Sequence, residues 1–135
     1  MFKSNSSKIP YQLLELILVA IGAVPGAILR WQAAGLLTGG SENVLVNVVG
    51  AAVLGLIIGL SSGPKTYLLV GVGFCGSLTT FSAWMVDCVV LIAKGEWFQA
   101  LGLIIFTLGI GLGAAALAYS LGRVIKRSKR FQSQP

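Results

Sequence analysis

A stretch of small and polar residues interrupts the apolar sequence between positions 73 and 87, which read GFCGSLTTFSAWMVD. Its glycine and hydroxyl residues, which let a backbone unwind and offer oxygen atoms to an ion, are Gly76, Ser77, Thr79 and Thr80. Backbone that leaves the helix within a membrane needs protein, water or an ion to satisfy its carbonyl and amide groups. The stretch therefore predicts a broken membrane helix that binds an ion.

Two aromatic residues follow the expected break. Phe81 and Trp84 are three positions apart, so they share a face of a helix that resumes near residue 80. The edge of an aromatic ring carries the positive part of its quadrupole and can face a small anion, whereas simple packing is the alternative role. Asp87 lies one turn further along that face, where it repels an anion unless it is paired or orients a hydroxyl. A solvated charge at a helix end is its alternative role.

Other polar residues stand alone in apolar surroundings. Asn47 lies about one turn inside an apolar run and predicts an interhelical hydrogen bond, and Thr107 is a lone hydroxyl in the last run. Arg30 is far enough from a loop to face water or a protein partner, with snorkelling to the membrane surface as the alternative. Pro25 predicts a kink or short break in the first run. Glu15, near the start of that run, is expected at the membrane interface.

The elements that must position these residues are membrane helices. The chain has 135 residues, of which 56% are hydrophobic and 10% charged, and its mean hydropathy is +0.88. Such a composition leaves too little polar surface for a soluble globule and predicts an integral membrane protein. Apolar runs at about 11–37, 43–62, 67–93 and 97–122 are each long enough to span a bilayer, and a basic tail follows at 123–135. We expect one four-helix membrane domain over residues 1–135.

Glycines recur in the second and fourth runs, at Gly50, Gly55 and Gly59 and at Gly102, Gly109, Gly111 and Gly113. Small residues at such spacing let membrane helices approach closely, so both runs are expected to form helix contacts.

Composition also excludes several classes of function. The sequence has no histidine, no Cys, Asp and Glu cluster with metal-ligand spacing and no paired nucleophile and base, so we expect no enzyme activity. Cys75 and Cys88 are expected to be reduced packing residues. The formal charge of +6 is concentrated in the tail, which indicates contact with anionic lipid and not with nucleic acid.

The placement of the positive charges predicts an orientation. Four spans put the N-terminus, the middle loop and the C-terminus on one side. That side carries eight Lys and Arg residues, and the other side carries two, Arg30 and Lys94. The positive-inside rule then places both termini in the cytoplasm of a multi-pass protein of the cell membrane.

In its motifs the chain resembles the Fluc-type (CrcB) fluoride ion channels. The resemblance rests on three segments in family order: GAILR at 26–30, VNVVG at 46–50 and GFCGSLTTFS at 73–82. Members of the family are four-helix membrane proteins that form antiparallel, dual-topology dimers with two pores. The resemblance thus implies an all-α integral membrane fold with four transmembrane helices, a broken third helix and a second Fluc-type subunit as partner.

The resemblance also implies roles for individual residues. In the family, backbone carbonyls that match Gly76 and Thr79 in each subunit hold a structural sodium ion (Na+) at the dimer axis. An asparagine, two aromatic residues and a track of hydroxyls line the fluoride path, and an arginine lies by an aqueous vestibule. The matching ion-pathway residues here are Asn47, Phe81, Trp84, Thr80, Ser82, Thr107, Arg30 and Asp87.

The implied function is passive export of fluoride from the cytoplasm, which protects the cell from fluoride toxicity. Fluoride is compact and strongly hydrated, so amide, hydroxyl and ring-edge groups must replace its water without trapping it. The sequence departs from the family pattern at four positions. Trp84 replaces a phenylalanine, Asp87 stands where glutamate is common, and Leu103 and Gly111 occupy places where polar residues are expected.

Two alternatives remain open from the sequence. The eight-to-two charge bias disfavours insertion in both orientations, so the chain is either half of a homodimer or a partner subunit of a heterodimeric fluoride channel that does not conduct alone. A small multidrug exporter is a remote alternative, because it needs an acid in the middle of its first helix and Glu15 is too close to the end.

Overall fold

A computed structural model describes residues 10–37 and 41–132, with side chains to Lys129, and this part of the chain is almost entirely helical. The helices are α1 (Tyr11–Leu36), α2 (Ser41–Gly59), α3 (Pro64–Thr66), the π-helix η1 (Tyr67–Cys75), α4 (Gly76–Leu78), α5 (Ser82–Ala93) and α6 (Trp97–Gln132). No strand occurs in the described ranges, which confirms the predicted all-α class.

Four stretches of the described chain are helical and apolar enough to cross a membrane: Tyr11–Leu36, Ser41–Gly59, Pro64–Ala93 and Trp97–Lys129. The third stretch contains α3, η1, α4 and α5, so the predicted broken third helix is confirmed. The protein is therefore a multi-pass membrane protein.

The helix of the fourth span extends beyond the apolar run. The apolar run ends at about residue 122, whereas α6 continues through the basic segment to Gln132 and has 36 residues. A helix of that length extends about 54 Å, more than the roughly 30 Å of a bilayer core. Lys and Arg are good helix formers, so the change from apolar to basic sequence marks the end of the apolar part and not of the helix.

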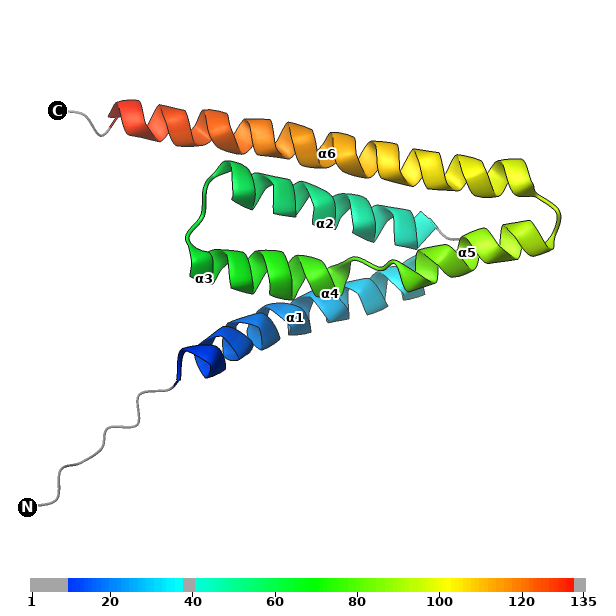
Figure 1. Cartoon of the computed structure of the whole chain (residues 1–135), viewed down its shortest axis with the longest axis horizontal. Coiled ribbons are helices and arrows are strands. Elements are labelled where there is room, and N and C mark those ends of the chain that lie inside the picture. Colours follow the sequence, from blue (N-terminus) through cyan, green and yellow to red (C-terminus); the bar gives the residue numbers. More distant parts are fainter. Residues whose placement is uncertain (1–9, 38–40, 133–135) are drawn as a thin grey trace, which may run out of the picture.

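The helices lie roughly side by side and the chain reverses direction between them (Figure 1). The start of α1, the α2–α3 connection and the end of α6 lie at one end of the molecule, and the α5–α6 hairpin lies at the other. α2 packs mainly along α6, and α1 packs mainly along η1. The break between α4 and α5 faces α2 near the middle of this arrangement.

Pro25 does not break the first helix, which runs without interruption from Tyr11 to Leu36. Of the kink or short break expected at Pro25, the break is therefore wrong, and the kink stays a prediction. One missing amide is tolerated within a membrane helix, whereas a full break in hydrocarbon would leave several backbone groups without partners. Gly26, directly after Pro25, is buried where α1 meets the start of the broken region, and a Cβ there would overlap Ser77 and the Phe74 carbonyl.

Glycines let α2 approach α6, as the sequence predicted for the second run. A Cβ at Gly55 would overlap the Ala115 carbonyl, and one at Gly59 would overlap the Tyr119 carbonyl. Gly102, Gly109, Gly111 and Gly113 of α6 are different, because a Cβ at these positions meets nothing within 4 Å inside this chain. The fourth run therefore packs along α2, but not through these four glycines within the described chain.

The buried core is small and lies around the broken helix. Its apolar residues are Val46, Ile57, Cys75, Leu78, Trp84, Cys88 and Ala100, and both cysteines are free thiols. Many large apolar side chains on α1, α5 and α6 are exposed. These outer faces suit contact with lipid acyl chains.

Candidate functional site: the broken third helix and an adjoining pocket

The break spans only three residues between two helices. α4 ends at Leu78, Thr79 is extended with φ −73° and ψ 155°, and α5 begins at Ser82. Thr80 is buried, although it lies outside regular structure. Irregular backbone at this depth requires specific partners, and α1 and α2 supply them.

The segment before the break is a π-helix, which the sequence did not predict. η1 covers nine residues, Tyr67–Cys75, and its Gly71 and Gly73 are buried. π-helical turns are rare and are frequently found at functional sites. The π-helix and the break together make the third span irregular over much of its length.

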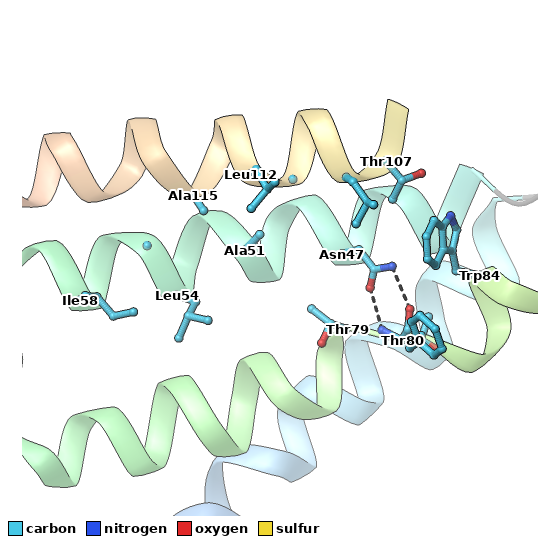
Figure 2. A pocket seen from close by; sticks show the side chains of 14 residues that line it. Asn47, Ala51, Leu54, Ile58, Thr79, Thr80, Trp84, Thr107, Leu112 and Ala115 are labelled. Atoms are coloured by element: carbon cyan, nitrogen blue, oxygen red, sulfur yellow. Dashed lines mark hydrogen bonds between the residues drawn. The ribbon is translucent and has the colours of Figure 1, made fainter. Parts of the chain in front are cut away.

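Asn47 of α2 holds the break in place with both ends of its side-chain amide. The Thr80 amide donates to Asn47 Oδ1 at 2.7 Å, and Asn47 Nδ2 donates to the Thr80 carbonyl at 2.8 Å (Figure 2). This paired arrangement replaces two backbone hydrogen bonds that a continuous helix would make. The interhelical hydrogen bond predicted for Asn47 is therefore present, and it is directed at the backbone of the break.

Two backbone carbonyls at the break, those of Gly76 and Thr79, lose the amide donors that a continuous helix would supply. In a continuous α-helix the amide of residue 80 donates to the carbonyl of residue 76, and the amide of residue 83 donates to the carbonyl of residue 79. Here the Thr80 amide donates to Asn47, and the Ala83 amide donates to Thr80 Oγ1 at 3.3 Å. The Gly76 and Thr79 carbonyls are consequently free of their helical donors.

Arg30 supplies a donor to one of these carbonyls. Its Nη1 donates to the Thr79 carbonyl at 3.2 Å, so the exposed guanidinium of α1 lies against the break. The Thr79 hydroxyl points the other way and donates to the Cys75 carbonyl at 2.9 Å. Arg30 was expected to face water or a protein partner, and within this chain its guanidinium contacts the backbone of the break.

A pocket of about 470 Å³ adjoins the break, between α2, α5 and α6 (Figure 2). Most of its wall is apolar, with polar groups gathered near the break. The lining residues are Asn47, Ala51, Leu54, Gly55, Ile58, Thr79, Thr80, Phe81, Trp84, Thr107, Leu108, Gly111, Leu112 and Ala115.

The pocket brings together most of the residues singled out in the sequence. The predicted pathway residues that line it are Asn47, Thr80, Phe81, Trp84 and Thr107. Arg30, Ser82 and Asp87 are not among the lining residues, and Ser82 is exposed. Glu15 is exposed on α1 and also lies outside this pocket.

The two aromatic rings after the break form an edge-to-face pair. The ring centroids of Phe81 and Trp84 are 5.9 Å apart and the ring planes meet at 61°. Trp84 is only 5% exposed, whereas Phe81 is 72% exposed within this chain. The predicted shared face is therefore present, with one ring packed inside and the other at the open side of the pocket.

Asp87 is paired and not freely solvated. Asn43 Nδ2 donates to Asp87 Oδ2 at 2.7 Å, which links α2 to α5 one turn away from the Asn47 contact. The sequence analysis missed Asn43. The signal was available, because Asn43 and Asn47 are four positions apart and so lie on one face of α2.

The site offers hydrogen-bond donors and ring edges in an apolar pocket and presents no carboxylate to it. A four-span membrane protein with a broken helix beside such a pocket has the architecture of proteins that move ions across membranes.

Comparison with known proteins specifies the family. Residues 17–119 match the family model described as CrcB-like protein, Camphor Resistance (CrcB), so the chain belongs to the CrcB family. A protein of Parasynechococcus marenigrum (strain WH8102) named "Fluoride-specific ion channel FluC 2" is 57% identical over 124 residues, which cover 92% of each chain.

A single organism contains two differently numbered relatives. In Synechococcus sp. (strain CC9902), a protein named "Fluoride-specific ion channel FluC 2" is 56% identical over 92% of this chain and 91% of its own length. A second protein of that strain, named "Fluoride-specific ion channel FluC 1", is 40% identical over 81% of this chain and 94% of its own length.

Proposed function

We propose that this chain is a subunit of a fluoride-specific ion channel that lets fluoride leave the cytoplasm passively. The observation that carries the proposal is the pocket at the broken helix, which is lined by Asn47, Phe81 and Thr107. The names of relatives that share more than half of their residues with this chain support the same function.

The pocket suits an anion that loses its water one step at a time. Asn47 Nδ2 carries two hydrogens, and one of them is used in the bond to the Thr80 carbonyl. Neutral donors and ring edges attract fluoride less strongly than a row of cations would, so the ion can also leave. Arg30 and Asp87 lie outside the pocket and are proposed to act at the approaches to the path.

Growth in the presence of fluoride tests the proposal in cells. We expect expression of the chain to restore growth of a bacterium whose own fluoride exporter has been deleted, because passive efflux prevents accumulation of the trapped anion. Growth at matched chloride concentrations serves as the control. Expression at the membrane without any gain in fluoride tolerance, both alone and with a second subunit, would contradict the proposal.

A structural sodium ion at the break is a second proposal. The Gly76 carbonyl is free of its helical donor, and Gly76 is exposed with open space around it, so this oxygen can serve as a ligand. The Thr79 carbonyl has a second lone pair beside the one that Arg30 uses. These residues fit a monovalent cation shared with a second subunit, where the ion would supply positive charge to hold two breaks together.

The sodium proposal makes a prediction about Thr79. Carbonyl oxygens and not side chains would bind the ion, so Thr79→Ser, which keeps the carbonyl and the hydroxyl, is expected to leave fluoride efflux nearly unchanged. A high-resolution structure of the assembled protein in sodium is expected to show an ion between two Gly76–Thr79 breaks. Clear density for both breaks with no ion between them would contradict the proposal.

The partner is proposed to be a second Fluc-type subunit in antiparallel orientation, with membrane lipid around the assembly. The occurrence of FluC 1 and FluC 2 in one strain supports a paralogue as partner, and the charge bias of this chain favours the same conclusion. In that case the chain reaches full activity only beside the other subunit. An identical partner is the alternative.

Cysteine labelling tests the orientation with two matched variants. Lys129 and Lys94 lie exposed near opposite ends of α6, while the native thiols of Cys75 and Cys88 are only 3% and 1% exposed. In intact cells, a membrane-impermeant thiol reagent is expected to label Lys94→Cys and to leave Lys129→Cys unlabelled, since both termini are proposed to be cytoplasmic. Equal labelling of the two variants would instead indicate insertion in both orientations.

A further inference from the structure

Two buried polar atoms in the wall of the pocket have no partner within the described chain. They are the indole nitrogen Nε1 of Trp84 and the hydroxyl oxygen Oγ1 of Thr107. Each of these side chains is only 5% exposed, and both line the pocket beside the break. A buried donor without an acceptor is costly, so two of them in one pocket indicate a missing ligand.

The chemistry of the two atoms restricts what the ligand can be. An indole N–H only donates, so its partner must be an acceptor, which excludes a cation. A threonine hydroxyl also donates when its neighbour is an acceptor. The remaining wall near Thr107 is formed by Leu108, Gly111 and Leu112, whose side chains offer no hydrogen-bonding atoms.

A small anion fits these conditions better than water does. A buried water normally needs two to four polar partners, and its own hydrogens need acceptors, whereas the side chains of Leu108, Gly111 and Leu112 beside Thr107 offer none. Fluoride has no hydrogens and accepts from every side. Figure 2 shows Trp84 and Thr107 at the same end of the pocket, beyond Asn47, with the indole nitrogen on the edge of the ring toward α6.

We propose that the indole N–H of Trp84 and the hydroxyl of Thr107 together form a fluoride coordination site in the wall of the pocket. This inference rests on the proposed function and specifies how the ion is held. Trp84 then acts as a hydrogen-bond donor to the ion in addition to packing against Phe81. Fluoride gains a charge-assisted N–H donor at a point where α6 contributes one hydroxyl and no other polar side chain.

The indole proton reports directly on this site. In protein labelled with ¹⁵N-tryptophan and assembled in micelles, the Trp84 indole proton is expected to move downfield in a saturable manner as fluoride replaces an inert anion. Chloride is expected to have no effect. Trp31 and Trp97 are 77% and 63% exposed and serve as internal controls, and Trp84→Phe assigns the signal.

Two variants connect this signal to ion binding. Thr107→Val keeps the shape of the side chain and removes the hydroxyl, so the Trp84 signal is expected to need about tenfold more fluoride for the same shift. Trp84→Phe keeps a ring and removes the N–H, and the fluoride concentration for half-maximal efflux is expected to rise by about the same factor.

The outcomes separate this inference from the proposed function. A Trp84 indole proton whose chemical shift does not change with fluoride, or changes equally with chloride, would overturn the proposed coordination site. Such a result shows that water or a direct contact between Trp84 and Thr107 satisfies the two atoms. Fluoride efflux from the wild type with unchanged efflux from Trp84→Phe would overturn it as well and leave fluoride conduction intact. A wild-type assembly without fluoride efflux would overturn the proposed function itself.

Discussion

Asn47→Asp is expected to reduce fluoride efflux by about a hundredfold. The wild-type amide donates to the Thr80 carbonyl and accepts from the Thr80 amide. Aspartate has no N–H, so its carboxylate would face the Thr80 carbonyl oxygen and place a negative charge in the wall of the pocket. Loss of the donor and the added repulsion together cost about 3 kcal/mol, which corresponds to about two powers of ten.

The neighbouring asparagine supplies a matched control. Asn43→Ala removes a side-chain hydrogen bond of similar length one turn away on α2, but Asn43 does not line the pocket at the break. Efflux from reconstituted vesicles, measured with a fluoride electrode, is expected to change only a few-fold in this variant. Equal losses in Asn43→Ala and Asn47→Asp would show that general weakening of the α2 contacts, and not the break, limits efflux.

Phe81→Ile is expected to reduce fluoride efflux by about tenfold while the protein still assembles. Isoleucine keeps an apolar side chain, but it removes an aromatic ring from the pocket lining and the edge-to-face contact with Trp84 at 5.9 Å. Aromatic pairs are worth about 0.5 to 1.5 kcal/mol beyond their buried area, and the upper end of this range corresponds to about one power of ten.

A second phenylalanine provides the comparison for this variant. Phe106 lies on α6, is 57% exposed and does not line the pocket, so Phe106→Ile makes the same chemical change outside the proposed path. Its efflux is expected to equal that of the wild type. Wild-type efflux from a correctly assembled Phe81→Ile protein would show that the Phe81 ring only packs.

The sequence predicted the features of the fold that depend on local composition. Apolar runs of sufficient length marked the four spans, and glycine and threonine within an apolar run marked the break near Gly76. The apolar run did not reveal how far α6 extends, because hydropathy falls at the basic segment while the helix propensity of Lys and Arg stays high. Of the kink or short break expected at Pro25, the break was wrong because a membrane penalises unpaired backbone more than one missing amide.

The arrangement of the site depends on contacts between distant residues, which local patterns do not reveal. Asn47 and Thr80 are 33 positions apart, and only the folded chain shows that this side chain replaces backbone hydrogen bonds of the third span. A π-helix has no characteristic amino-acid composition, so η1 was not predicted from the sequence. The resemblance to the fluoride channels implied an anion path through Asn47, Phe81 and Thr107, but the convergence of these residues on one pocket required the packing of α2, α5 and α6.

Selective efflux from vesicles tests the central claim most directly. The chain is purified alone and together with any second subunit that copurifies with it, and each preparation is reconstituted into vesicles loaded with fluoride or with chloride. We predict rapid release of fluoride and retention of chloride in at least one preparation, because the pocket offers neutral donors at close range to a small anion. Fluoride release no faster than from protein-free vesicles in both preparations, or equal release of the two anions, would contradict the account.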